Sequence, residues 1–171
     1  QTAKYVARTR RLAVYITDTR KTTPGLRLLE KFAVRMGGGK NHRLHLGDGI
    51  LIKDNHLAAL YGVGMSLKDI VAKAKQNVPK GLKVEVEVTS LQEAKDAVEA
   101  GADIIMLDNM SPDEMRCAVN LKPSQVKVEA SGGITLVNVH QAALTGVDFI
   151  SIGALTHSAK ALDISLELDS P

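Results

Sequence analysis

The sequence predicts an α/β fold, an incomplete (β/α) TIM-like barrel of about six or seven parallel strands. Two observations lead to this prediction. Short β-rich segments alternate with segments of helical spacing about every 20 residues. No linker, low-complexity tract or reversal typical of a doubly wound sheet interrupts the series. A chain of 171 residues with 44% hydrophobic residues is long enough for one domain with its own core.

The first third of the chain is expected to place two strands on either side of a helix and a glycine-rich stretch. A helix over residues 2–11 precedes a β-rich run at 13–17. Helical spacing returns over 26–36, after a Pro-Gly break. The glycine-rich segment 37–49 then leads into a short strand at 50–52.

The remainder has a more regular pattern, because serine-based caps predict where the helices begin. Ser66, Ser90 and Ser111 each stand three residues before an acidic residue, which is the spacing of a capping box, and Thr135 is expected to cap a further helix. The strands expected between and after these helices are 83–88, 104–107, 126–130 and 149–152, and an apolar run from Leu162 to Leu168 is expected to be a strand or a helix.

Composition excludes several classes of protein. The single cysteine, Cys117, excludes an internal disulfide and a multi-cysteine metal site, and we expect it to be buried on a helix. No apolar run approaches the roughly 18–20 residues of a membrane helix, and no signal peptide is visible, so a cytoplasmic enzyme domain is the simplest expectation. Because the chain begins at Gln1, without Met and inside an expected helix, we expect an upstream segment to be missing.

Positive charge is concentrated in one stretch, from Asp18 to His56. It holds eight Lys or Arg residues against four acidic residues, although the whole chain carries a net charge of only +3. The cations are interleaved with glycines rather than with an aromatic platform or a long basic helix, which argues against nucleic acid as the partner. The pattern predicts a pocket for a small, multiply charged anion.

Chemically distinctive residues also follow each expected strand. In a (β/α) barrel such positions converge on the mouth formed by the carboxyl ends of the strands, where barrel enzymes carry out their chemistry. Glu85 and Glu87 alternate along one strand and should face the interior, and we favour Glu87 as the functional one because it lies nearer the mouth. The residues expected at the mouth are Asp18, Arg20, Lys21, Lys53, Glu87, Asp108, Ser131-Gly132-Gly133 and Gly153.

Each group of these residues allows more than one interpretation. Glu87 and Asp108 could hold Mg²⁺ or ribose hydroxyls, or could form salt bridges with nearby lysines. The glycines of the two late loops could let backbone N–H groups approach a phosphate, or could simply be turns. The cations expected to bind a carboxylate or phosphate are Arg20, Lys21, His42, Arg43 and Lys53. Those expected on the solvated surface are Arg27, Lys31, Arg35 and Lys40.

The motif DTRKTTPGLRLLEKFAVRMGGGKNHRLHLGDGILIKDNH at 18–56 resembles the central motif of the quinolinate phosphoribosyltransferase family. The resemblance continues through VEVEV at 84–88, IIMLDNM at 104–110, EASGGI at 129–134 and GVDFISIGALTHS at 146–158, to the closing LDISLEL. It therefore covers essentially the whole chain, with the motifs in order. It implies that residues 1–171 are one catalytic barrel domain and that the family's N-terminal α/β sandwich domain is absent from this chain.

The family transfers a phosphoribosyl group from phosphoribosyl pyrophosphate to quinolinate with Mg²⁺, releasing pyrophosphate and CO₂. The resemblance also implies a homodimer or higher homo-oligomer with a shared active site, and neither nucleic-acid nor membrane partners. It assigns quinolinate and pyrophosphate to Arg20, Lys21, His42, Arg43 and Lys53, with Lys21, Lys53, Glu87 and Asp108 as catalytic residues. It assigns the ribose and Mg²⁺ to Glu87 and Asp108, and the 5′-phosphate to Ser131, Gly132, Gly133 and Gly153, with His157 close by.

Three other interpretations of the residues stay open. A nicotinate or nicotinamide phosphoribosyltransferase would handle one carboxylate or amide and release no CO₂, whereas the dense cation cluster favours a dicarboxylate. An aldolase-type barrel would use Lys53 as a Schiff-base amine. A non-catalytic domain that binds an anion or RNA would not require Glu87 or Asp108, and its affinity would fall steeply with salt.

Overall fold

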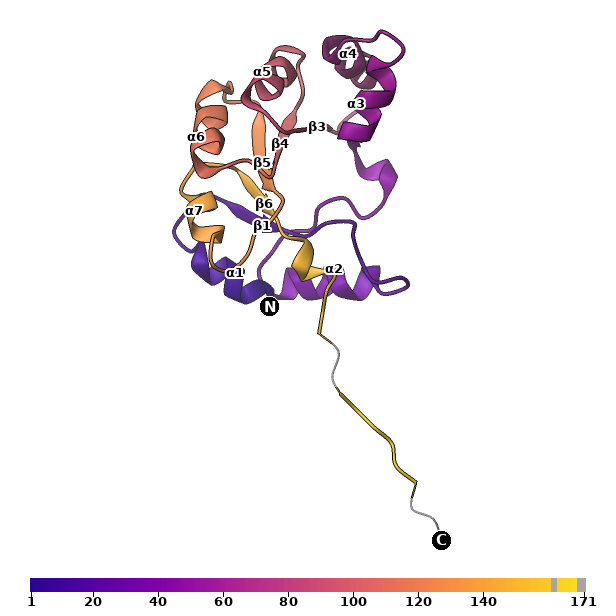
Figure 1. The fold of residues 1–171 in the computed structure, drawn as a ribbon, viewed down its shortest axis with the longest axis vertical. Coiled ribbons are helices and arrows are strands. Elements are labelled where there is room, and N and C mark those ends of the chain that lie inside the picture. The colour runs from indigo at the N-terminus through magenta and orange to yellow at the C-terminus, as the bar shows by residue number, and fades with distance from the viewer. Residues whose placement is uncertain (161–162, 169–171) are drawn as a thin grey trace.

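The computed structural model describes residues 1–160 and 163–168. Its parallel strands are surrounded by helices on the outside (Figure 1). The strands are β1 (Tyr15–Thr17), β2 (Ile50–Ile52), β3 (Val84–Val88), β4 (Ile104–Asp108), β5 (Lys127–Ser131) and β6 (Phe149–Ser151). The helices are α1 (Thr2–Arg8), α2 (Arg27–Met36), α3 (Asp54–Tyr61), α4 (Leu67–Asn77), α5 (Leu91–Glu99), α6 (Pro112–Leu121) and α7 (Val139–Ala143), with two 3₁₀ turns, η1 (Leu46–Asp48) and η2 (Gly153–Leu155).

The six strands form one sheet in the order β1-β6-β5-β4-β3-β2, and every neighbouring pair is parallel. β1 and β2 are the two edges of the sheet and do not pair with each other, so the barrel is incomplete, as predicted. The chain between these edges runs beside β1 instead. There the Lys40 N–H donates to the Ile16 carbonyl over 2.8 Å, and the Asp18 N–H donates to the Lys40 carbonyl over 3.3 Å.

The alternation of residues along the strands separates an apolar outer layer from a polar interior. In β3, the side chains of Val84, Val86 and Val88 are at most 1% exposed and belong to the apolar core that includes helix residues such as Val71 and Ala97. Glu85 and Glu87 alternate with these valines and face the other side, as predicted. The core therefore lies between the sheet and its helices, which leaves the interior of the barrel free for polar side chains.

The serine caps position three helices as predicted. The Ser66, Ser90 and Ser111 hydroxyls accept hydrogen bonds from the third residue of α4, α5 and α6. The prediction for α7 was wrong at its start. This helix begins at Val139, because Asn138 folds back to accept a hydrogen bond from the Thr135 N–H over 2.8 Å.

Helix α3 was not predicted. It lacks a serine or threonine cap and buries only Leu57, so neither the capping signal nor an apolar stripe marks it in the sequence. His56 fixes its first turn instead, since His56 Nδ1 accepts a hydrogen bond from the Lys53 N–H over 3.0 Å. The helix places Lys53 at its N-cap, directly after β2.

Two further predictions were wrong. Cys117 lies on α6 as expected, but it is exposed, because Met115 and Ala118 form the buried face of that helix. The apolar run at 162–168 forms no helix or strand over residues 163–168, which are exposed and lead away from the body (Figure 1). Leu162 lies outside the described residues. Among the described residues, no helix is long and apolar enough to cross a membrane.

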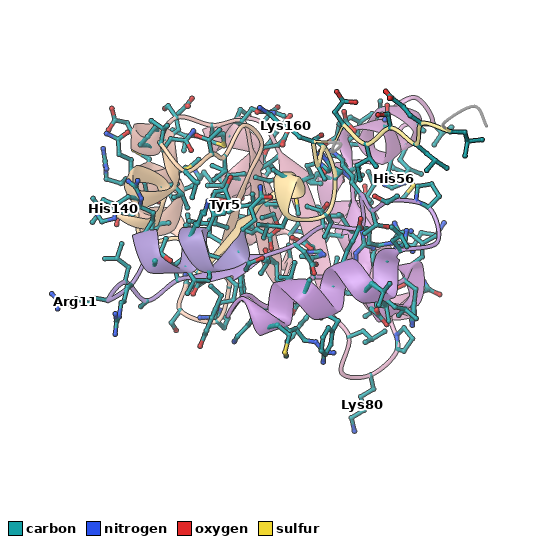
Figure 2. The ribbon with its side chains drawn as sticks, turned by 90° about the horizontal axis from the view of Figure 1, so that it is seen from below. Tyr5, Arg11, His56, Lys80, His140 and Lys160 are labelled. Carbon is teal, nitrogen blue, oxygen red and sulfur yellow. The ribbon has the colours of Figure 1, made fainter. Side chains whose placement is uncertain are left out.

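Helices α1 and α2 cover the side of the molecule that is seen in Figure 2. Tyr5 of α1 points inward and is 4% exposed, whereas Arg11 and Lys80 project outward (Figure 2). The ring of His140 on α7 is hydrogen-bonded through Nδ1 to the Arg8 carbonyl over 2.9 Å. This contact joins the last helix to the first and holds α1 beside the β1 edge.

Candidate functional site

A cavity of about 370 Å³ lies inside the incomplete barrel, between the segment 40–50 and the sheet. His42 and Arg43 line it from that segment, and Glu85 and Glu129 line it from β3 and β5. The cavity reaches toward the amino ends of the strands, where Ile104 and other first strand residues contribute to its wall. It therefore lies below the mouth, and Lys53, Glu87 and Asp108, which were predicted at the strand ends, are not among its lining residues.

A buried carboxylate fixes the segment that carries His42 and Arg43. Asp18, directly after β1, is fully buried and accepts hydrogen bonds from Lys31 Nζ over 2.5 Å, from Asn41 Nδ2 over 2.5 Å and from the His42 N–H over 2.9 Å. Lys31 was predicted on the surface, and this was wrong: the residue is 2% exposed. Because α2 supplies this lysine, the helix and the strand together hold the backbone at His42.

The His42 imidazole lies between two glutamates. His42 Nε2 lies 3.0 Å from Glu85 Oε2 and 3.6 Å from Glu129 Oε2. Burial alone would lower the pKa of His42, but the hydrogen bond to Glu85 and the negative charge of both glutamates outweigh it, so this pKa lies above its ordinary value. The imidazolium form is thereby favoured, and it presents positive charge to the cavity.

Three side-chain polar atoms are buried and lack a hydrogen-bond partner among the described residues: Arg43 Nε and Glu85 Oε1 of the cavity lining, and Arg20 Nε on the loop after β1. Arg43 is held through Nη1, which donates to the Gly49 carbonyl over 3.0 Å. Burial lowers the pKa of Arg43, and the charge of Glu85 only partly offsets that effect. Two buried arginine N–H groups without an acceptor among the described residues are chemically suited to an anion.

The mouth holds a second group of charges. Lys53 Nζ forms an ion pair with Glu87 Oε2 at 2.6 Å. Asp108 lies at the end of β4, the strand that pairs with β3, and its Oδ2 accepts a hydrogen bond from Asn109 Nδ2 over 2.9 Å. The alternative considered for Glu87, a salt bridge to a nearby lysine, is thus what the structure contains. Each carboxylate keeps its second oxygen free of any partner among the described residues.

The glycines of the two late loops lie close to polar side chains at the same mouth. Gly132 and Gly133 have φ angles of +83° and +61°, which favour glycine, and a methyl group at Gly132 would overlap the Asn109 amide. After β6, a methyl group at Gly153 would overlap the imidazole of His157. Ser131 ends β5 and is half-buried beside Asp108, its register partner on β4.

The remaining predicted residues lie on the loop after β1. The Lys21 carbonyl accepts a hydrogen bond from Thr156 Oγ1 over 2.7 Å, which ties this loop to the chain after β6, while the Lys21 residue is exposed. The Arg20 carbonyl accepts a hydrogen bond from Arg27 Nη2 over 3.3 Å. Of the other residues expected on the surface, Arg35 and Lys40 are exposed and Arg27 is half-buried.

The structure therefore separates the predicted residues into two sets. His42 and Arg43 line the interior cavity, whereas Lys53, Glu87, Asp108 and the glycine loops lie at the mouth. Sequence reasoning missed Glu129, and it ranked Glu85 below Glu87. A signal was present, because Glu129 is the one acidic residue in the strand segment KVEAS and is flanked by apolar residues. Three possible metal ligands that lie within 4.8 Å of one another are His42, Glu85 and Glu129 rather than the predicted pair, Glu87 and Asp108.

Comparison with known proteins agrees with this architecture. Residues 1–167 match the family model described as quinolinate phosphoribosyl transferase, C-terminal domain. The chain is 51% identical over 155 residues to a probable carboxylating nicotinate-nucleotide pyrophosphorylase of Bacillus subtilis, covering 91% of this chain and 52% of that protein. It is 48% identical over 170 residues to the carboxylating nicotinate-nucleotide pyrophosphorylase of Rattus norvegicus, covering 98% and 56%.

Solved structures give the same result. The nicotinate-nucleotide pyrophosphorylase of Francisella tularensis superposes with a TM-score of 0.85 at 44% identity, covering 96% of this chain and 57% of that one. The chain spans about half the length of the curated relatives it matches. The match over residues 1–167 and the identity to these relatives leave one conclusion: the chain belongs to the quinolinate phosphoribosyltransferase family, of which it represents the C-terminal domain.

Proposed function

We propose that the complete protein transfers the phosphoribosyl group of phosphoribosyl pyrophosphate to quinolinate, in NAD biosynthesis. The products are nicotinate mononucleotide, pyrophosphate and CO₂. The observation that carries the proposal is the family match over residues 1–167, together with the names of the relatives, which are carboxylating nicotinate-nucleotide pyrophosphorylases. Because the chain spans about half of those relatives, the activity of the complete protein is part of the proposal.

In this proposal quinolinate binds at the interior cations. The unpartnered Nε–H groups of Arg20 and Arg43 suit carboxylate oxygens, and the His42 imidazolium adds a third positive charge. His42 and Arg43 line one cavity, and Arg20 is close enough to Arg43 to help lower its pKa; such a cluster of cations favours a substrate with two carboxylates over one with a single carboxylate. Asp18 supports the arrangement, because it fixes the backbone of the segment that presents His42 and Arg43.

The leaving pyrophosphate is assigned to Lys21 and Lys53 at the mouth. As pyrophosphate departs, the ribose develops positive charge, and the carboxylates of Glu87 and Asp108 would stabilise that charge and orient the ribose hydroxyls. Lys53 Nζ already forms an ion pair with Glu87 Oε2 at 2.6 Å. This pair would link the lysine that stabilises the negative charge of the pyrophosphate to the carboxylate that stabilises the positive charge of the ribose.

The 5′-phosphate is assigned to the glycine loops after β5 and β6. Gly132 and Gly133 have no side chain to block the approach of an anion to their N–H groups, and Ser131 adds a hydroxyl. Gly153 and His157 would contribute from the next loop, since the imidazole lies directly over Gly153. Both loops follow neighbouring strands, as the phosphate-binding loops of many barrels do.

Magnesium fits Glu87 and Asp108 by the chemistry of its ligands. Both are carboxylates at the ends of adjacent strands, and each retains one oxygen that is free of protein partners among the described residues. The bound ion would neutralise charge on the pyrophosphate. With the ion bound, Glu87 would still orient Lys53, and Asp108 would still orient the Asn109 amide.

Loss of CO₂ needs no further cofactor in this scheme. Ribosylation of the quinolinate nitrogen makes the ring positively charged. That charge stabilises the electron pair left on the ring carbon when CO₂ departs, and the carbon then takes up a proton from water. For the complete protein the proposal has three further parts. They are the family's N-terminal α/β sandwich domain, a homodimer or higher oligomer that shares the active site, and a cytoplasmic location.

Two rival functions differ in chemistry. A nicotinate phosphoribosyltransferase would use the same mouth but would not need the dense interior cations. A domain that binds RNA would need its cations on an open surface, whereas His42 and Arg43 lie inside a cavity together with two glutamates. The interior position of these residues favours a small molecule over a polymer.

The test is a turnover assay on the complete protein with quinolinate, phosphoribosyl pyrophosphate and Mg²⁺, using quinolinate labelled in its 2-carboxylate. We expect labelled CO₂ and nicotinate mononucleotide in equal amounts. Nucleotide formed from nicotinate, without CO₂ from quinolinate, would move the assignment to the non-decarboxylating enzyme. No product from either substrate would contradict the proposal.

A further inference from the structure

The loop after β1 carries Arg20 and Lys21, and two of its main-chain carbonyls are held by side chains from distant parts of the chain. The Arg20 carbonyl accepts a hydrogen bond from Arg27 Nη2 of α2 over 3.3 Å. The Lys21 carbonyl accepts one from Thr156 Oγ1, which follows β6, over 2.7 Å. Because this part of the chain forms neither a helix nor a strand, such contacts determine where its backbone lies.

The hydrogen bond from Thr156 is the shorter of the two and is shielded from water. Thr156 is 2% exposed, whereas Arg27 is half-buried. A hydroxyl has one hydrogen to donate. The Lys21 carbonyl at 2.7 Å lies within the normal range for such a bond, whereas the Gly153 carbonyl is 3.4 Å from the same oxygen. The hydrogen is therefore donated to Lys21, which lies 135 positions earlier in the sequence.

Lys21 is held by its main chain rather than by its side chain. Both of its hydrogen bonds to other described residues use the backbone: the N–H donates to Thr19 Oγ1 over 3.1 Å, and the carbonyl accepts from Thr156. The residue itself is exposed. The region that the ammonium group can reach therefore depends on where the backbone of Lys21 is fixed.

The backbone of Thr156 belongs to a different part of the mouth. Its N–H and that of His157 both donate to the Gly153 carbonyl, over 2.9 Å and 3.1 Å, and so complete the turn η2 after β6. Gly153 and His157 are the residues of this loop that the proposed function assigns to the 5′-phosphate. Thr156 therefore joins that loop, through its hydroxyl, to the loop that carries Lys21.

We propose that Thr156 is a positioning residue: its hydroxyl fixes the main chain of Lys21 relative to the turn η2, so that the ammonium group of Lys21 reaches the departing pyrophosphate. The inference rests on the proposed function, which assigns Lys21 to the pyrophosphate and the turn η2 to the 5′-phosphate. Both phosphate groups belong to one substrate, so the two loops must keep the spacing that this substrate requires. Loss of the hydroxyl would keep the charge of Lys21 but would release its backbone.

The kinetic test uses Thr156→Val in the complete protein, because valine has nearly the shape of threonine but no hydroxyl. We expect kcat to fall by roughly 10- to 100-fold with the KM for quinolinate little changed, since stabilisation of the leaving group is a transition-state interaction. Thr156→Ser retains the donor and should keep most of the wild-type turnover. A Thr156→Val protein with wild-type kcat would overturn the proposal, and so would a Thr156→Ser protein as slow as Thr156→Val.

Thr145→Val is the matched control for the loss of a buried hydroxyl. Thr145 lies just after α7, is 5% exposed, and donates through Oγ1 to the Ala142 carbonyl over 2.6 Å. The two valine variants should lower the urea midpoint by similar amounts, but only Thr156→Val should lower kcat. If both variants lose the same fraction of turnover, Thr156 acts only as a buried hydroxyl that supports the fold, and the proposal is wrong.

A double variant tests whether Thr156 acts through Lys21. Lys21→Met removes the ammonium group that the hydroxyl is proposed to position. Adding Thr156→Val to Lys21→Met should therefore slow turnover no further, because residues that act as a unit have non-additive effects. Losses that multiply in the double variant would overturn the proposed route through Lys21.

Amide hydrogen exchange tests the position of the loop without reference to turnover. Over residues 18–26 the complete protein should exchange faster in Thr156→Val than in wild type, whereas Thr145→Val should match wild type there. If Thr156→Val does not fold, Thr156→Cys, whose thiol is a weaker donor, should show a smaller change in the same direction. Unchanged exchange in the loop would overturn the proposal. Absence of turnover in wild type, with faster exchange in Thr156→Val, would contradict the proposed function while supporting the positioning role of Thr156.

Discussion

Two lysine–carboxylate ion pairs of nearly equal length have very different surroundings. Lys31 and Asp18 lie 2.5 Å apart with side chains 3% and 0% exposed, whereas Lys53 and Glu87 lie 2.6 Å apart with side chains 43% and 11% exposed. The first pair also receives hydrogen bonds from Asn41 and from the His42 N–H. In the second pair the Lys53 side chain is open to water. Distance is therefore a poor guide to their roles, and burial is the better one.

The difference follows from the electrostatics of each environment. A buried charge that loses its partner keeps the full cost of having left water, whereas an exposed charge regains its hydration. We infer that the Asp18 pair maintains the fold around the cavity, while the Glu87 pair is free to exchange partners during the reaction. The following substitutions test that division, from the largest expected effect on stability to the smallest.

Lys31→Met should give the largest loss of stability. Among the described residues it removes the one ammonium group paired with Asp18 and leaves a buried carboxylate with hydrogen bonds alone, so the free energy of unfolding should fall by about 3–5 kcal/mol. Urea denaturation of the variant and of Lys73→Met, the same change at an exposed position on α4, measures this difference. A loss as small as that of the control would mean that the pair does not maintain the fold.

Gly132→Ala should give an intermediate loss of stability. Gly132 lies at the mouth, as the Lys53–Glu87 pair does, but its backbone is tightly constrained, so it is an exception to the contrast between a constrained interior and an open mouth. The positive φ angle costs about 1–2 kcal/mol for alanine, and the new methyl group would displace the Asn109 amide from Asp108. Gly101→Ala is the matched control, with a φ of +87° and open space around it. We expect Gly132→Ala to lose more stability than Gly101→Ala in urea denaturation, and also to lower kcat. Equal losses in the two variants would show that the Asn109 contact is dispensable.

The sequence was informative wherever a local signal determined the outcome. Ser66, Ser90 and Ser111 marked three helix starts, because a cap depends only on residues three positions apart. The alternation in VEVEV correctly predicted that Glu85 and Glu87 face the interior. Parallel strands separated by helices also indicated an incomplete barrel, because each βα unit shows its own periodicity.

The rest depended on contacts between distant segments. Nothing beside Lys31 in the sequence indicates that its partner is Asp18, 13 residues earlier on a different element. The pairing of His42 with Glu85 joins residues 43 positions apart, and Glu129 meets Ser151 only because β5 and β6 are neighbours in the sheet. Such buried polar contacts follow from the order of the strands, which the sequence pattern does not specify.

Lys53→Met should give the smallest loss of stability, although we expect it to affect activity most. At 43% exposure the lysine contributes under about 1 kcal/mol to folding, because solvent screens the pair. If Lys53 stabilises the departing pyrophosphate, however, kcat should fall by roughly 10²–10³-fold. Urea denaturation and steady-state turnover, measured on the same preparation of the complete protein, separate the effect on stability from the effect on activity. Lys75→Met provides the control, since the ion pair of Lys75 with Asp103 is similarly exposed but lies far from the mouth. A strongly destabilised Lys53→Met protein would show that this pair also maintains the fold. A stable variant that keeps its turnover would show that the pair is not needed for the reaction. Either result would contradict the division between the two ion pairs.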